Sequence, residues 1–382
     1  MRINFSGYGL AGTFLGHYIP AVVHKINTIN CMFDFGRPDE EAATGLNNKI
    51  NRQPLGITTM AEKIVLNGLT KKFGPILAVD NISLSVATGE VLGFLGPNGA
   101  GKSTTMRMLT GFIEPTSGTA EVCGLDVTRH PVEIKRRIGY LPEGAPTYGD
   151  MTPESYLGFI AEIRGFNGPE IRRRIEAVTE KVDIGSVLRQ PIDTLSKGFK
   201  RRVGLAQAML HDPEILIMDE PTDGLDPNQK HQVRKLIREM SADRAIIIST
   251  HILEEVEAVC SRAVIIAHGR LLADSTPEEL LSRAPDHNAV MITVDTNKSD
   301  AVKKTLEGLD AVKNTRSEKT ANGATRLVIR PKKGKLIADD VSQLLRSKNI
   351  PVQEMFVERG SLDDVFRKIT KDGKSAGGGT NA

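Results

Sequence analysis

The feature that most constrains the fold of this chain is a glycine-rich loop preceded by an apolar run. Residues 96–103 read Gly-Pro-Asn-Gly-Ala-Gly-Lys-Ser and fit the pattern G-x-x-x-x-G-K-[ST]. The run Val91–Leu95 precedes the loop, and residues 104–110 can continue as a helix. This order predicts a phosphate-binding loop and an α/β fold of the P-loop type. A chance glycine-rich turn, the alternative, accounts for neither the strand nor the helix.

The residue types in this loop suit a triphosphate bound to Mg²⁺. Glycines let the backbone curl so that successive N–H groups point at phosphate oxygens, and the positive end of the helix dipole adds to the attraction. The Lys102 ammonium is expected between the β- and γ-phosphates, and the Ser103 hydroxyl is expected to bind Mg²⁺. The residues predicted to line the phosphates are Gly96, Pro97, Asn98, Gly99, Ala100, Gly101, Lys102, Ser103 and Thr104.

A pair of carboxylates follows an apolar run further along the chain. Residues 215–218 read Ile-Leu-Ile-Met, and Asp219 and Glu220 come directly after them. A buried strand would deliver Asp219 rigidly to the Mg²⁺ ion and place Glu220 where it can polarise a water for attack on the γ-phosphorus. In isolation, a buried strand ending in a helix-capping acid would be the simpler reading. Downstream of a phosphate-binding loop, the catalytic reading is favoured.

Strand and helix patterns alternate from residue 61 to residue 284. The short runs at 215–218 and 245–249 are almost wholly apolar, which is typical of buried parallel strands. Polar and apolar residues alternate at 64–69 and 81–86, which indicates an antiparallel portion at the start. We therefore predict an α/β domain over residues 61–284 with a largely parallel core sheet.

The segment 285–370 has a different pattern. Strands are expected at 290–294, 311–315, 325–329 and 352–357, and helices at 299–307, 336–347 and 362–369. The order β-α-β-β-α-β with a last helix suggests a small α+β domain of the ferredoxin-like kind.

The two ends of the chain carry no such pattern. Residues 1–60 are rich in Gly, Asn and Thr, and we expect them to be a disordered extension or an artefact of an upstream start codon. Residues 371–382 are rich in Gly, Lys and Ser, and we expect a disordered tail.

Composition narrows the function classes. The chain has 382 residues with 50 Lys and Arg against 47 Asp and Glu, a formal net charge of +3, which gives no support for a nucleic-acid partner. Its three cysteines form no C-x-x-C pair, so no zinc or disulfide framework is indicated. No apolar run approaches the roughly 18–20 residues of a membrane helix. We therefore expect a soluble cytoplasmic protein, and any membrane-spanning part must come from another polypeptide.

Further motifs resemble those of ABC-type ATPases. Residues 195–202, Leu-Ser-Lys-Gly-Phe-Lys-Arg-Arg, resemble the signature sequence of that family, and residues 221–227, with Asp226, resemble its D-loop. The remaining matches are His251 at the switch histidine, Phe73 at the aromatic residue that stacks on adenine, and Glu143 at the Q-loop. The motifs occur in the family's order, so the resemblance implies an ABC-type nucleotide-binding domain over most of the chain.

The resemblance implies a mechanism shared between two subunits. ATP held by the phosphate-binding loop of one subunit would be covered by Ser196, Gly198 and Asp226 of a second copy or a similar ATPase. Catalysis would rest on Glu220, His251 and Lys102, with His251 contacting the γ-phosphate. Mg²⁺ would be bound by Ser103, Glu143 and Asp219. Loss of the γ-phosphate would open the pair of subunits.

The same resemblance implies a membrane partner. In the family, the surface at residues 143–157 receives a helix of a separate integral membrane permease, and the ATPase lies at the inner face of the cell membrane. A soluble ABC ATPase acting on ribosomes or DNA is an alternative, but no second such domain and no long coiled-coil insertion is evident. A non-catalytic regulator is another alternative, against which the intact Lys102, Asp219, Glu220 and His251 argue.

The motifs depart from the usual family pattern at three positions. Lys197 and Phe199 replace a Gly and the Gln of Leu-Ser-Gly-Gly-Gln, and Glu143 replaces the Q-loop Gln. A carboxylate can bind Mg²⁺ but cannot donate a hydrogen bond as an amide does. These changes, with residues 359–366, resemble an exporter-type subgroup that includes gliding-motility, sodium-efflux and nitrous-oxide-accessory ATPases. The basic runs 172–174 and 200–202 are expected to be solvated helix faces.

Overall fold

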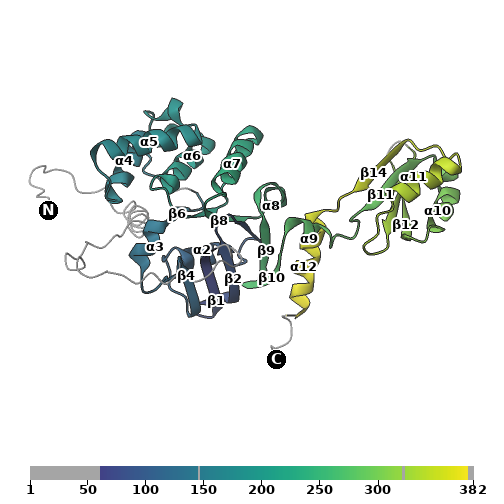
Figure 1. Ribbon diagram of the computed structural model, residues 1–382, viewed down its shortest axis with the longest axis horizontal. Coiled ribbons are helices and arrows are strands. Elements are labelled where there is room, and N and C mark those ends of the chain that lie inside the picture. The colour runs from purple at the N-terminus through teal and green to yellow at the C-terminus, as the bar shows by residue number, and fades with distance from the viewer. Residues whose placement is uncertain (1–60, 145–146, 321–322, 377–382) are drawn as a thin grey trace, which may run out of the picture. The chain divides into compact units, whose positions relative to one another are not determined.

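The computed structural model describes residues 61–144, 147–320 and 323–376. The expected extension at residues 1–60 and the tail beyond residue 376 lie outside the described residues. By its internal contacts the described chain forms two compact units. Unit 1 contains residues 61–91 and 101–250, and unit 2 contains residues 92–100 and 251–376. Figure 1 shows the helices and strands of both units.

Unit 1 begins with an antiparallel sheet, as its alternating sequence pattern predicts. Its strand order is β2-β1-β4-β5, and helix α2 (Lys102–Leu109) packs against β2 and β4. The strands are β1 (Glu62–Phe73), β2 (Ile76–Ala87), β4 (Ser117–Val122) and β5 (Leu125–Asp126).

Three parallel strands form the buried centre of unit 1. They are β6 (Ile138–Leu141), β7 (Ile215–Asp219) and β8 (Ala245–Thr250), and β7 pairs with both others. Every residue of the three is buried, because helices and neighbouring strands cover both faces of a parallel sheet. Parallel strands end at one edge, so β7 and β8 bring residues that follow them close together.

Helices cover this centre. They are α3 (Pro131–Arg137), α4 (Pro153–Ile163), α5 (Gly168–Val182), α6 (Lys197–Met209) and α7 (Pro227–Met240). Helices α4, α5 and α6 contact one another and form a helical subdomain, at the end of unit 1 away from β1, β2 and β4 (Figure 1). Helix α6 packs against β6 so closely that a Cβ at Gly139 would lie 2.2 Å from the Ala208 carbonyl oxygen.

The basic run at residues 200–202 was predicted to face solvent, and for two of its residues that prediction is wrong. Arg201 and Arg202 are each only 6% exposed, whereas Lys200 is half-buried. Their guanidinium groups donate hydrogen bonds to backbone carbonyls and polar side chains inside unit 1. Sequence alone did not show which face of α6 the parallel strands and α7 would cover.

His211, just after α6, gives the fold a dependence on pH. Its Nε2 lies 3.1 Å from the Ile138 carbonyl oxygen, and its buried Nδ1 has no hydrogen-bond partner among the described residues. Burial, together with the positive charges of Arg164, Arg174 and Arg244, lowers the pKa of His211 to about 2. The imidazole therefore stays neutral in the folded protein at pH values where an unfolded chain would bind a proton.

We expect acid to destabilise the protein through this residue. The unfolded histidine titrates near pH 6.5, so its contribution is fully present above that pH and is lost as the pH falls below it. Between pH 7 and pH 5, the loss should approach about 2 kcal/mol. Urea unfolding at the two pH values measures this loss in the wild type and in His211→Gln, a variant that retains a hydrogen-bond donor for the Ile138 carbonyl oxygen. Equal pH dependence in the two proteins would contradict the assignment.

Unit 2 begins with strand β3 (Val91–Leu95), whose residues from Leu92 onward pair in parallel with β9. Strands β9 (Arg262–Ala267) and β10 (Arg270–Ser275) form an antiparallel hairpin, with α8 (Leu253–Val259) before it and α9 (Pro277–Leu281) after it. The last helix, α12 (Leu362–Ala376), packs on α9, β9 and β10. It extends beyond residue 370, where the disordered tail was expected to begin.

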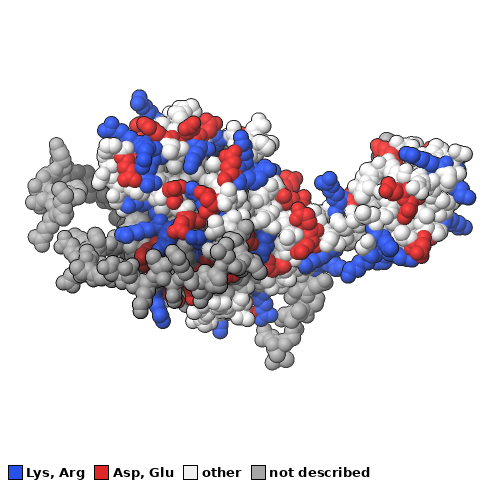
Figure 2. All heavy atoms as spheres, in the orientation of Figure 1, with Lys and Arg blue, Asp and Glu red and all other residues white. Residues whose placement is uncertain are grey.

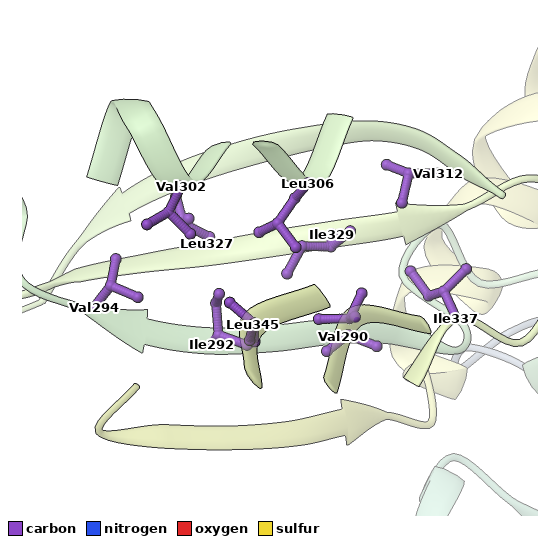
Figure 3. Packing of buried hydrophobic residues seen from close by; sticks show 11 residues of the cluster. Val290, Ile292, Val294, Val302, Leu306, Val312, Leu327, Ile329, Ile337 and Leu345 are labelled. Atoms are coloured by element: carbon purple, nitrogen blue, oxygen red, sulfur yellow. The ribbon is translucent and has the colours of Figure 1, made fainter. Parts of the chain in front are cut away.

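The rest of unit 2 is a separate antiparallel sheet with two helices. The elements are β11 (Ala289–Val294), α10 (Ser299–Glu307), β12 (Val312–Lys319), β13 (Thr325–Pro331), α11 (Ala338–Ser347) and β14 (Glu354–Glu358). The strand order is β12-β13-β11-β14, and the element order is the β-α-β-β-α-β expected from the sequence. Alternate residues of β11 and β13 point at the two helices and form one apolar cluster, which includes Val290, Ile292 and Leu327 (Figure 3).

Two short segments connect this sheet to α9 and α12, and they lie side by side. The Asn288 N–H donates to the Glu358 carbonyl oxygen at 2.8 Å, and Ala289 pairs with Glu358 across the first rung of the β11–β14 ladder. A Cβ at Gly360 would lie 2.7 Å from the Ala284 Cβ, so only glycine allows this approach. The chain thus leaves α9, forms the sheet and returns beside its point of departure.

Among the described residues, no helix combines the length and the apolar composition that crossing a membrane requires.

Candidate active site

The first half of the predicted phosphate-binding loop follows β3 in unit 2. A Cβ at Gly96 would lie 2.3 Å from the Ile266 carbonyl oxygen, so the loop packs on the backbone of β9. Gly99 has a φ of 79°, which is left-handed and favours glycine. The Ala100 N–H donates to the Pro97 carbonyl, and the Ala100 carbonyl accepts from the Gly269 N–H at 3.0 Å. These contacts give the loop a tight curl.

The second half of the loop opens helix α2 in unit 1. Gly101 caps the helix with a φ of 104°, and no side chain caps the first turn. The helix dipole favours an anion at this end of the helix. Lys102 is 6% exposed, and Ser103 and Thr104 are half-buried. The positive-φ glycines thus stand where the sequence predicts a phosphate cradle.

The charges of three carboxylates of unit 1 act on the Lys102 ammonium. Burial lowers the pKa of Lys102, and the negative charges of Glu220, Asp219 and Glu143 oppose that shift, in this order of size. The three carboxylates that the sequence predicts for Mg²⁺ binding and catalysis are therefore the ones that act on the loop lysine. Electrostatically, the lysine and the three carboxylates form one site.

The carboxylate pair is held by the strand beside it. Asp219 is 2% exposed and its Oδ1 accepts a hydrogen bond from the Ser249 hydroxyl at the end of β8. The Glu220 N–H donates to the Ser249 carbonyl oxygen at 3.0 Å. Ser249 was not predicted as a site residue, although its position at the end of a buried apolar strand was the available signal. This hydrogen bond orients the Asp219 carboxylate, as the outer partners of metal-binding carboxylates commonly do.

Glu220 has an unusual backbone conformation. Its φ is 52°, in the left-handed region that non-glycine residues rarely adopt, and its side chain is 8% exposed. Such conformations cost about 1–3 kcal/mol and persist where surrounding contacts hold them. The contacts around the turn after β7 therefore hold the Glu220 backbone in this conformation, with its side chain buried.

The signature segment and the D-loop segment lie together on another surface of unit 1. The Ser196 hydroxyl caps α6 by accepting from the Phe199 N–H at 3.3 Å, and the Asp226 carboxylate caps α7 by accepting from the Gln229 N–H at 2.9 Å. A Cβ at Gly198 would lie 2.2 Å from the Gln229 Oε1, so the first turns of the two helices are adjacent. Ser196 and Asp226 are both exposed, so two positive helix ends face solvent side by side.

Phe73 and His251 are the remaining residues predicted for the site. Phe73 ends β1 and is 46% exposed, and the Lys71 ammonium lies 5.1 Å from its ring centroid. His251 is the first residue of unit 2 after β8 and has an exposed side chain. An exposed aromatic ring is available for stacking, as the adenine prediction requires.

The donor set suits Mg²⁺ only together with a ligand that supplies oxygens. Within residues 61–144, 147–320 and 323–376, no group of three or more His, Cys, Asp or Glu could hold a metal ion. Mg²⁺ commonly takes one or two carboxylates and completes its shell with phosphates and water. Ser103, Asp219 and the exposed Glu143 fit that requirement.

Fold and site define a class: an α/β P-loop nucleotide-binding domain with a helical subdomain and a carboxylate pair after a buried strand. Comparison with known proteins assigns it further. A family model described as "ABC transporter" matches residues 79–223. The chain is 35% identical over 222 residues to the ABC transporter ATP-binding protein NatA of Bacillus subtilis, covering 57% of this chain and 90% of that protein. The chain belongs to the family of ABC transporter ATP-binding proteins.

Other comparisons agree on the domain. Over 217 residues the chain is 36% identical to the probable multidrug ABC transporter ATP-binding protein YbhF of Escherichia coli. The aligned region covers 56% of this chain but only 37% of that protein. A solved structure described as the ATP-binding subunit of an ABC transporter matches with a TM-score of 0.54 and 30% identity, over 57% of this chain and 91% of that one. The predicted α/β P-loop fold is thereby confirmed, and the matched domain is an ABC ATPase domain.

Proposed function

We propose that this protein is the ATP-binding and ATP-hydrolysing subunit of an ABC transporter, in which two such subunits close over two ATP–Mg²⁺ and drive a separate membrane permease. The observation that supports this most directly is the buried pair Asp219 and Glu220, held by Ser249 at the ends of β7 and β8, whose charges act on the buried Lys102 ammonium. This group combines a cation for phosphates with carboxylates for a metal ion and for a water.

In the proposed mechanism, ATP binds first to the loop and helix α2. Backbone N–H groups of the loop and of the first turn of α2 donate to the phosphate oxygens, and the Lys102 ammonium lies between the β- and γ-phosphates. Phe73 stacks on the adenine. Ser103 and Asp219, with Glu143, would hold Mg²⁺, which would supply positive charge to neutralise the phosphates. The Ser249 hydroxyl keeps the Asp219 carboxylate oriented for that task.

Hydrolysis then depends on Glu220. Its fixed backbone presents the carboxylate at the end of β7, where it accepts a proton from the water that attacks the γ-phosphorus in line. We assign His251 the role of orienting this water and donating a hydrogen bond to the γ-phosphate. The products are ADP and phosphate, and Lys102 remains as a cation beside the phosphate that leaves.

The second subunit enters through the surface formed by the starts of α6 and α7. Ser196, Gly198 and Asp226 lie there, with two helix N-termini facing solvent. A γ-phosphate held by another copy would be attracted by the positive N-terminus of α6, where the cap is the neutral Ser196. Such a shared ligand links dimer closure to ATP and dimer opening to hydrolysis.

A matched pair of variants at Ser196 tests this shared geometry. Aspartate and asparagine both cap helices well, so α6 should start unchanged in Ser196→Asp and Ser196→Asn. The aspartate would repel a γ-phosphate, and we expect ATP-dependent dimerisation to fall at least about tenfold for Asp while Asn retains it. Light scattering after gel filtration with ATP and EDTA measures the dimer. Equal dimerisation by both variants would contradict the shared site.

The membrane partner is proposed to dock at residues 143–157, which include the start of α4; residues 145–146 fall outside the described residues. The protein would then lie at the inner face of the cell membrane, held there by the permease.

The departures at Glu143, Lys197 and Phe199 support an exporter of the subgroup that resembles gliding-motility, sodium-efflux and nitrous-oxide-accessory ATPases. Acidic and basic side chains are interspersed over the visible face (Figure 2), so the proposal names no nucleic-acid partner.

The experiment for this function is purification of the full chain from membranes in mild detergent. We expect an integral membrane protein to co-purify and to raise the ATPase rate. Recovery with ribosomes or DNA in place of a membrane protein would support the alternative of a soluble ABC ATPase, which the comparisons do not favour.

A further inference from the structure

Arg201 occupies an unusual position for a charged side chain. It lies in α6, one turn after the Ser196 cap, and is 6% exposed. Its guanidinium donates to four backbone carbonyls: Nη1 to Pro142 at 2.9 Å, Nε to Pro221 at 3.4 Å, and Nη2 to Asp219 and to Glu220. All of these groups lie in unit 1.

Three of the four carbonyls are consecutive. Carbonyl oxygens of residues 219, 220 and 221 that converge in a buried space repel one another unless a donor lies between them. They converge because Glu220 has a left-handed φ of 52°. The five N–H donors of a guanidinium, fixed in one plane, can satisfy several carbonyls together. Arg201 therefore stabilises the strained backbone that sets the direction of the Glu220 side chain.

The fourth carbonyl extends this link to another part of the site. Pro142 directly precedes Glu143, the acidic residue at the Q-loop position. The same guanidinium thus joins residue 142 to the turn that carries Glu220, and its own helix begins at Ser196. A shift of residues 142–143 would change the hydrogen bonds that hold the Glu220 backbone.

Charge supports the same arrangement. Burial lowers the pKa of Arg201, and the nearby carboxylates of Asp219, Asp223, Glu220 and Glu143 oppose that shift. The residue therefore also supplies positive charge behind a site with several carboxylates. Without it, the backbone carbonyls and the carboxylates would face one another in a poorly solvated space.

We propose that Arg201 is a positioning residue for ATP hydrolysis, which holds Glu220 in its left-handed conformation and couples it to residues 142–143. The inference rests on the proposed function and adds to it a route from the predicted permease-docking segment to the catalytic carboxylate. Arg201 touches neither phosphate nor water in this account; it acts through the backbone of residues 219–221.

The neighbouring residue provides a matched control. Arg202 lies on the same helix and is also 6% exposed. Its guanidinium donates to the Val182 and Asp183 carbonyls, to the Asp183 carboxylate at 3.1 Å and to the Gln232 side chain. These groups belong to the end of α5 and to α7, away from the carboxylate pair. Loss of Arg202 should therefore destabilise the helices without displacing Glu220.

The test compares steady-state kinetics of Arg201→Met, Arg201→Lys and Arg202→Met in the full chain. A displaced catalytic group can cost about 10²-fold, so kcat should fall by about that factor in Arg201→Met while KM for ATP stays within about threefold. Lysine keeps the charge but cannot span the four carbonyls, and we expect about a tenfold loss. Arg202→Met should keep kcat within about threefold. An equal loss in both methionine variants would overturn the proposal, and so would a normal kcat in Arg201→Lys.

A second measurement does not depend on turnover. Hydrogen–deuterium exchange of the nucleotide-free protein should show faster exchange of the amides of residues 220–223 in Arg201→Met and Arg201→Lys, and faster exchange at 182–183 in Arg202→Met. Unchanged exchange at 220–223 in both Arg201 variants would overturn the inference. A wild-type protein without ATPase activity would instead refute the proposed function, and the exchange measurement would still decide the role of Arg201.

Discussion

Glu220→Gln should abolish ATP turnover while ATP still binds. The amide keeps the shape of the side chain but cannot accept the proton of the attacking water, and loss of a general base commonly costs about 10²–10⁴-fold. The affinity for ATP should stay within about threefold, because Lys102 and the loop remain. The ATP-bound dimer should accumulate, since the step that opens it is blocked. Phosphate release and light scattering measure the two effects.

The control for this variant is Glu239→Gln, an exposed glutamate of α7 whose carboxylate lies 3.8 Å from the Lys235 ammonium. It makes the same chemical change on the surface and should leave kcat unchanged, because exposed ion pairs contribute little. Normal hydrolysis by Glu220→Gln would show that another group is the base. That result would also remove the reason for the fixed backbone described above.

Lys102→Met should weaken ATP binding strongly. Burial has already removed much of the hydration of this ammonium, so its attraction for phosphate is weakly screened. Truncating one partner of a buried charge pair costs about 2–5 kcal/mol, which predicts an ATP affinity at least about 30-fold weaker. Without bound ATP no dimer should form. Binding of a fluorescent ATP analogue, compared with Lys235→Met on the surface of α7, measures the loss.

Retained affinity in Lys102→Met would mean that the backbone N–H groups alone hold the triphosphate. The dimer would then be expected to form as in the wild type, and the role of Lys102 would be restricted to the chemical step. Lys102→Met therefore tests the dependence of ATP binding on Lys102, and Glu220→Gln tests the dependence of turnover on Glu220.

Several parts of the structure could be predicted from the sequence because local chemistry determines them. The apolar run ending at Asp219 predicts a buried strand that carries a carboxylate. The glycine-rich sequence before Lys102 predicts a phosphate-binding loop. Helix α10 covers the predicted residues 299–307, since its apolar residues recur with helical spacing. The identity of the ABC family was visible in the order of the motifs, and the comparisons confirm it.

Other parts depend on packing that no local pattern records. Arg201 looked like a solvated charge, and its burial follows only once α6 lies against the turn after β7. Ser249 was seen as the end of a strand, but its hydrogen bond to Asp219 arises from the pairing of β7 with β8. The left-handed backbone of Glu220 is likewise a product of its neighbours, because glutamate has no intrinsic preference for it.

The paired connections of the small antiparallel sheet have a consequence for how such a protein is assembled. Cα atoms of directly opposed residues in antiparallel strands are about 5 Å apart, so the gap between Ala289 and Glu358 could be closed by a two-residue turn. The sheet is therefore an insertion that we expect to be removable, because the last helix packs on α9 and the β9–β10 hairpin. Evolution or a protein engineer can exchange it without disturbing the helix that follows.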